Sequence, residues 1–238
     1  MPLCLLIALW ACTSKLIPAS PSPLAIWHEL GVRFGAPDFR LALAGSLRRM
    51  AIGYGLVAVL GVSGGLLLGR FKFMDDLLGS IAVALHAIPG AAWVPLAILW
   101  FGATERAVIF TILLGATGIV VVETDQGIRQ VPPLLVRAAR TMGARGFNFF
   151  WHVVVPAAIP QIVNGLRLAW AFGWRALMAG ELLTAVPGLG QMLSRVAQAG
   201  QLDALLTLML LMAAIGMVVD ELIFKRLEHA IRLRWGLA

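Results

Sequence analysis

The stretch "RAARTMGARGFNFFWHVVVPAAIP", residues 137–160, decides the fold. It begins as a short basic amphipathic run, is interrupted at Gly143 and then re-enters apolar sequence that contains two prolines. Glycine readily adopts the left-handed conformation that ends a helix. Aromatic residues such as Trp151 favour the boundary of a membrane. The stretch therefore predicts a short surface helix, a break and then a membrane helix.

The composition of the whole chain supports a membrane protein. The chain has 238 residues, of which 60% are hydrophobic and only 13% are charged, and its net charge is +7. A soluble domain of this length needs a larger polar share. The basic residues fall mainly between apolar blocks, which indicates membrane orientation rather than nucleic-acid binding. Cys4 and Cys12 lie in one apolar stretch and have no metal-binding or disulfide spacing.

The apolar blocks predict an all-α polytopic protein with about six transmembrane helices, because about 20 apolar residues cross the hydrocarbon core. The predicted spans are residues 2–18, 50–69, 79–102, 107–122, 153–186 and 204–219, the last extended by Ile223 and Phe224. Residues 37–50 between the first two spans read as an interfacial amphipathic helix whose arginines reach the headgroups. The distribution of basic residues favours a cytoplasmic C-terminus.

One predicted span carries Gly61, Gly65 and Gly69 at a spacing of four residues. Small residues at this spacing let another helix approach closely in a membrane. The stripe predicts helix packing rather than a functional site.

The opening stretch resembles the EAA signature of ABC importer permeases. Ala138 and Ala139 are followed by Gly143 after three residues, and the pattern closes at Val153 and Pro156. Arg137 stands where the family usually has glutamate. Three further segments, residues 88–102, 165–183 and 188–193, resemble motifs of the nitrate, sulfonate and taurine branch of the family. The resemblance runs from about residue 45 to residue 225.

This resemblance implies a type I ABC importer permease fold. It implies an N-terminal helix and periplasmic connector at 1–44, a permease core at 45–225 and a basic cytoplasmic tail at 226–238. It also implies a coupling helix at about 133–147 that docks on a separate ATPase. The residues expected at that contact are Arg137, Ala138, Ala139, Arg140, Met142 and Gly143.

The partners implied by the resemblance are two ATPase subunits, a second permease subunit that forms a homodimer, and a periplasmic or extracellular solute-binding protein. The resemblance also implies a location in the bacterial cytoplasmic membrane and favours a sulfonate, taurine, nitrate or similar small molecule as the solute. The sequence contains no G-x-x-x-x-G-K-[ST] loop. ATP and Mg²⁺ are therefore expected on the partner, with no cofactor or metal on this chain.

Ionisable residues inside the predicted spans are candidates for the solute pathway, because burying charge in hydrocarbon is costly. They are His86, Arg167, Arg175 and Glu181. Two roles are open for them. Arg175 either lowers the energetic cost of moving an oxyanion through the pore or neutralises Glu181, six residues away. Arg167 either pairs with a backbone carbonyl or faces the dimer interior. The prolines expected to interrupt helices are Pro89, Pro95, Pro156 and Pro160.

Two other functions compete with a permease subunit. A secondary transporter usually shows two repeated halves, and the sequence shows no such duplication. An intramembrane lipid-acting enzyme needs a catalytic constellation, and no H-E-x-x-H motif or convergent acidic set occurs.

Overall fold

The computed structural model describes residues 22–234, and this part of the chain is helical without strands. The α-helices are α2 (Pro23–Gly35), α3 (Pro37–Arg70), α4 (Lys72–Ala87), α5 (Val94–Phe101), α6 (Glu105–Arg129), α7 (Pro133–Thr141), α8 (Gly146–Phe149), α9 (Val155–Thr184), α10 (Leu189–Gln198), α11 (Leu202–Val219) and α12 (Arg226–Arg234). A 3-10 turn (Gly90–Trp93) precedes α5. Two π-helical turns, Phe150–Val154 and Asp220–Lys225, join α8 to α9 and α11 to α12.

Four helical runs in the described residues are long and apolar enough to cross a membrane, and a bent pair adds a fifth. The four are Pro37–Arg70, Glu105–Arg129, Gly146–Thr184 and Leu202–Ile231. They contain the predicted spans at 50–69, 107–122, 204–219 and most of 153–186. The predicted span at 2–18 lies outside the described residues.

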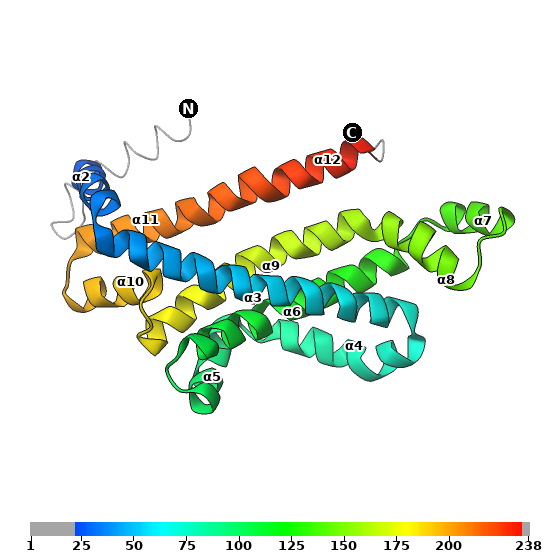
Figure 1. Ribbon diagram of the computed structural model, residues 1–238, viewed down its shortest axis with the longest axis horizontal. Coiled ribbons are helices and arrows are strands. Elements are labelled where there is room, and N and C mark those ends of the chain that lie inside the picture. The colour runs from blue at the N-terminus through cyan, green and yellow to red at the C-terminus, as the bar shows by residue number, and fades with distance from the viewer. Residues whose placement is uncertain (1–21, 235–238) are drawn as a thin grey trace.

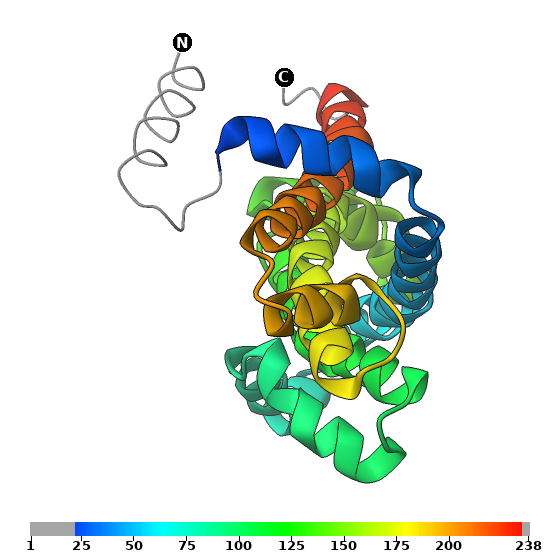
Figure 2. The same cartoon turned by 90° about the vertical axis from the view of Figure 1, so that its left-hand side faces the viewer.

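The long helices run along the long axis of the molecule (Figure 1). Helix α7 lies at one end of this bundle, whereas α5 and α10 lie toward the other end (Figure 1). Figure 2 looks along the bundle and shows α2 lying across the direction of the long helices. The two ends of the bundle are therefore built from different short helices.

Helices α3 and α6 run in parallel and in close contact. A Cβ added to Gly61 would lie 2.5 Å from Val120 Cβ, and one added to Gly65 would lie 2.4 Å from Thr124 Cβ. Farther along, Gly69 faces Ile128 in the same way. The predicted role of the glycine stripe in helix packing is confirmed, because each glycine admits a β-branched side chain of α6.

Helix α9 packs against α6 in the antiparallel direction, and glycines again allow the close contact. A Cβ on Gly165 would lie 2.6 Å from Glu123 Cβ, and one on Gly180 would lie 3.3 Å from Val108 Cγ1. Glycines of α3 and of α9 thus allow both helices to pack closely against α6, which lies between them. This three-helix arrangement sets the rotation of α9 about its own axis.

Replacing Gly65 by valine is expected to destabilise the protein by about 1–3 kcal/mol, the usual cost of overpacking a core. The added side chain meets Thr124 and the Val121 carbonyl, which lies 2.7 Å from the new Cβ. Thermal unfolding in detergent measures the effect. Gly55→Val on the same helix is the matched control, since its Cβ meets nothing within 4 Å. Equal midpoints for the two variants would contradict the close packing of α3 and α6.

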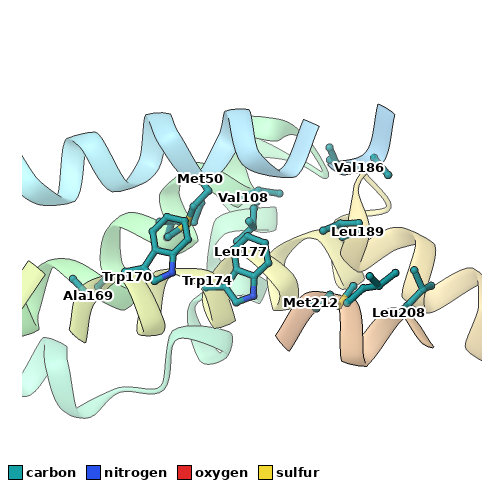
Figure 3. Close-up of a cluster of buried hydrophobic side chains, with 14 of the residues drawn as sticks. Met50, Val108, Ala169, Trp170, Trp174, Leu177, Val186, Leu189, Leu208 and Met212 are labelled. Carbon is teal, nitrogen blue, oxygen red and sulfur yellow. The ribbon is translucent and has the colours of Figure 1, made fainter. Parts of the chain in front are cut away.

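The main hydrophobic cluster fills the space between α3, α6, α9, α10 and α11. Trp170 and Trp174 of α9 stack with ring centroids 5.9 Å apart, and Leu189 of α10 lies beside Met212 and Leu208 of α11 (Figure 3). Burying such aromatic side chains contributes a large share of core stability. The cluster joins α10 and α11 to the three-helix arrangement.

Two predictions about the spans are wrong. Residues 37–50 do not form a separate interfacial helix, because they are continuous with the following span in the 34-residue helix α3. Arg49 within them is 1% exposed rather than extended toward headgroups. Residues 79–102 do not form one straight span, since the chain bends by 100° between Ala87 and Gly90. Pro89 lies at that bend.

Candidate functional site

The short surface helix predicted from the sequence is α7. Pro133 occupies its first turn, where a missing N–H leaves no bond unmade. Its end is closed by hydrogen bonds from the Gly143 N–H to the Arg140 carbonyl, at 3.0 Å, and from the Ala144 N–H to the Ala139 carbonyl, also at 3.0 Å. Gly143 has φ of +88°. The predicted left-handed break is confirmed.

Helix α7 touches the membrane helices through a small number of aromatic contacts. The Arg140 guanidinium lies 5.8 Å from the centroid of the Phe149 ring. Val136 packs against the cluster that contains Phe150, and the Arg70 guanidinium lies 5.7 Å from the Phe150 ring. A cavity of about 440 Å³ lies beside these contacts. Phe149 and Phe150, which lie shortly after the break at Gly143, therefore form the contacts that hold α7 against the bundle.

The outer side of α7 is apolar and uncovered. Leu134 is 74% exposed and Met142 is 88% exposed. Arg137 and Ala138 are also exposed, whereas Ala139 is partly buried. An exposed apolar face rimmed by charged residues marks an interaction surface.

The structure brings His86 and Arg175 together across Phe172, a residue that the sequence analysis did not single out. The His86 ring meets the Phe172 ring edge-on at 5.5 Å between centroids. The Arg175 guanidinium lies 4.6 Å from the Phe172 centroid. Phe172 was not identifiable by charge, although its position three residues before Arg175 is the spacing of helical neighbours.

Arg175 has an exposed side chain on a membrane helix. It donates a hydrogen bond of 3.0 Å to the Ala171 carbonyl, and among the described residues it forms no ion pair. Of the two roles left open for Arg175, the neutralisation of Glu181 is wrong, because Glu181 pairs with Arg49 instead. A cavity of about 460 Å³ that opens beside α9 and α11 is lined in part by Arg175, Trp170 and Trp174.

Arg167 belongs to a separate polar cluster. Its Nε and Nη2 atoms each donate to a carboxylate oxygen of Asp220 at 2.7 Å, and Nη1 donates to Glu228 at 3.0 Å. The expected pairing with a backbone carbonyl is therefore wrong. Such a bidentate pair joins α9 to the helical run that includes α12.

Glu181 lies in a third cluster, away from both arginines of α9. It is fully buried and pairs with Arg49 of α3 at 2.7 Å. Sequence reasoning missed Arg49 because the two residues are 132 positions apart.

The prolines that were expected to interrupt helices lie at different positions within them. Pro95 lies in the first turn of α5 and therefore does not interrupt it. Pro156 lies in the first turn of α9 after a π-helical turn, and Pro160 lies inside α9. Within residues 22–234, no group of three or more His, Cys, Asp or Glu side chains is arranged to hold a metal ion.

The fold defines a class of membrane protein. A chain of the MetNI methionine ABC transporter, in an inward-facing conformation, superposes with a TM-score of 0.70 at 18% identity, covering 81% of this chain and 95% of that one. A chain of an amino acid ABC transporter gives a TM-score of 0.65 at 19% identity, covering 83% and 94%. The fold is thus that of a helical membrane component of ABC transporters.

The chain belongs to the family of binding-protein-dependent transport system inner membrane components, which matches residues 59–233. It is 33% identical over 177 residues to a putative ABC transporter permease protein of Methanocaldococcus jannaschii. That match covers 74% of this chain and 66% of the relative.

Two other relatives carry more specific names. A nitrate import permease protein of Synechocystis is 31% identical over 178 residues, covering 75% of this chain and 65% of the relative. A taurine transport system permease protein of Escherichia coli is 29% identical over 205 residues, covering 84% and 74%. The chain thus spans slightly less than two thirds of the first two relatives.

Proposed function

We propose that this chain is the permease subunit of an ATP-driven importer that moves a small solute with an oxyanion group, such as a sulfonate, taurine or nitrate, by alternating access. The observation that carries the proposal is α7, an exposed amphipathic helix that is followed by a left-handed glycine, Gly143. Family membership supports the reading, as do the names of the nitrate and taurine relatives.

Helix α7 is the contact with the ATPase. Leu134 and Met142 present exposed apolar surface that fits a groove. Arg137 and Arg140 rim that surface with positive charge, and Ala138 leaves room for close approach. The partner binds and hydrolyses MgATP, and its motion reaches α9 through the short segment after Gly143.

The complete assembly contains two copies of this chain, two ATPase subunits and an external solute-binding protein. Much of the surface of α3, α4 and α11 is exposed and apolar in one copy. Lipid covers part of this surface, and a second copy covers the rest.

The solute passes the face of α9 that carries Arg175. Among the described residues, the Arg175 guanidinium has no carboxylate partner, so its charge is available to an oxyanion. His86 and Phe172 hold this face against α4. A positive side chain on a pathway lowers the barrier for an anion, as charged rings do in pores.

Purification of the tagged chain in mild detergent tests the assembly. We expect an ABC-type ATPase to be recovered with it, and the binding protein, purified separately, to carry a small anion identifiable by mass spectrometry. Recovery of the chain without any ATPase would contradict the proposed function.

Single cysteines test the proposed orientation, after Cys4 and Cys12 are replaced by serine. Reagents applied outside intact cells should label Gln198→Cys on α10, and they should miss Arg140→Cys and His229→Cys. All three positions have exposed side chains. The basic character of the two protected regions motivates the prediction. External labelling at position 140 or 229 would reverse the topology.

A further inference from the structure

A buried network of charged and polar side chains joins α3 to the end of α9 that lies away from α7. Arg49 is 1% exposed and Glu181 is 0% exposed. The Arg49 Nε and Nη2 atoms donate to Glu181 Oε1 at 3.0 and 2.7 Å, and Nη1 donates to Glu105 Oε1 at 3.0 Å. Charges buried in this way persist only where their partners are well placed.

The network also binds the backbone of the loop that follows α9. The Ser46 hydroxyl donates to Glu181 at 2.8 Å and accepts the Leu189 N–H at 2.9 Å. Glu181 Oε2 accepts the Gly190 N–H at 2.9 Å, and Arg49 Nη2 donates to the Pro187 carbonyl at 2.6 Å. Three backbone groups of residues 187–190 are thus held by side chains of other segments.

The loop has no room for larger residues at its two glycines. A Cβ on Gly188 would lie 2.4 Å from Glu181 Oε2 and 2.5 Å from Arg49 Nη2. A Cβ on Gly190 would lie 2.6 Å from the Met178 carbonyl. Ala185, where the loop begins, has φ of 57°, a conformation that costs a non-glycine residue energy. The network therefore holds the loop in a conformation that its own sequence does not favour.

The loop sets the direction of α10. This helix has only 10 residues, too few to cross a membrane. Leu189 and Val196 are buried, whereas Arg195 and Gln198 are exposed. Helix α10 lies toward the end of the bundle opposite α7, so it lies at the outer end if α7 meets the ATPase (Figure 1).

We propose that Ser46, Arg49 and Glu181 are positioning residues that hold the 185–190 loop, whose last two residues begin α10, and α10 itself in the orientation that receives the solute-binding protein. This inference rests on the proposed function. The network does not contact the solute. It links the outer end of α9 rigidly to the 185–190 loop and α10, so that these segments move together. When the binding protein docks on that surface, the displacement passes directly into α9.

Two mild variants test the proposal. In Glu181→Gln, Arg49 keeps Glu105 and the Pro187 carbonyl as partners, so no buried charge is left alone. In Ser46→Ala, the ion pair between Arg49 and Glu181 remains, whereas the hydrogen bonds of the hydroxyl to Glu181 and to the Leu189 N–H are lost. Arg48→Gln is the matched control, because Arg48 is exposed and pairs with Glu105 but touches no part of the loop.

The measurement is ATP hydrolysis by the reconstituted complex, with and without saturating solute-loaded binding protein. The stimulation should fall about tenfold in Glu181→Gln and about threefold in Ser46→Ala, because the first variant weakens every charge-assisted hydrogen bond of Glu181 and the second removes only the one from Ser46. Hydrolysis without binding protein and recovery of the complex should stay within about twofold, and Arg48→Gln should keep full stimulation.

Two results would overturn the proposal. One is undiminished stimulation in both variants. The other is a parallel fall of basal hydrolysis, stimulation and complex recovery, which indicates a role in folding alone. If no ATPase copurified with the tagged wild-type chain, the proposed function itself would be refuted. Failure of the proposed function is therefore distinguishable from failure of this inference.

Discussion

Gly143→Val is expected to yield a membrane-inserted protein that no longer retains its ATPase and no longer supports uptake. Gly143 has φ of +88°, and a Cβ at this position would meet nothing within 4 Å. The effect is therefore conformational and not steric crowding by neighbours. A non-glycine residue in the left-handed region loses about 1–2 kcal/mol, which corresponds to roughly five- to thirtyfold in an equilibrium.

The strain acts on α7 because that helix has few other attachments. If residue 143 leaves the left-handed region, the exposed surface of Leu134 and Met142 points away from the ATPase groove. Recovery of the ATPase with the tagged chain measures this loss. Membrane fractionation should show unchanged insertion, since the apolar runs are untouched.

Gly200→Val is the matched control for Gly143→Val. Gly200 also has a positive φ, +66°, with nothing within 4 Å of an added Cβ, but it lies between α10 and α11. It should carry the same local strain and leave ATPase recovery unchanged. Equal losses in the two variants would show that strain anywhere disrupts the complex, and normal recovery in Gly143→Val would remove α7 from the ATPase contact.

Arg175→Gln is expected to raise the KM for uptake of an anionic solute by roughly ten- to 150-fold, with little change in ATPase recovery. The estimate follows from the worth of a hydrogen bond to a charged group, about 1.5–3 kcal/mol. Arg175 lies over Phe172 and, in the described part of the chain, has no carboxylate partner. Removing its charge therefore leaves no buried countercharge behind.

Arg175→Lys separates the contribution of charge from that of shape. Lysine keeps the positive charge but loses the planar contact with Phe172, so its KM should lie between those of the wild type and Arg175→Gln. Uptake that is unchanged in both variants, or a solute that proves cationic, would exclude Arg175 from an anion pathway.

The bent segment after Lys72 shows where sequence reasoning was incomplete. Residues 79–102 have the length and composition of a span, and hydropathy cannot distinguish one straight helix from two pieces at 100°. Pro89 was recognised as an interruption, yet the size of the bend depends on the tertiary position of Gly90, whose added Cβ would lie 3.0 Å from Ala176 Cβ on α9.

The charged side chains in the spans also show what could and could not be predicted from the sequence. Their cost in a membrane identified Arg167, Arg175 and Glu181 as unusual, because burial of charge is unfavourable wherever it occurs. Their partners could not be derived in the same way. Arg167 meets Asp220 and Glu228, and Glu181 meets Arg49, so each pair joins helices far apart in the chain.

The sequence by itself determined the helical membrane character, the glycine stripe of α3 and the surface helix that ends at Gly143. These features depend on apolar length, residue size and backbone freedom, which are properties of single segments. Only the tertiary structure decided that Arg49 is buried rather than interfacial, that Phe172 lies between His86 and Arg175, and that the 185–190 loop is held by Ser46 and Glu181. Such contacts depend on which helices become neighbours and on how each helix is rotated about its axis. Local sequence patterns specify neither.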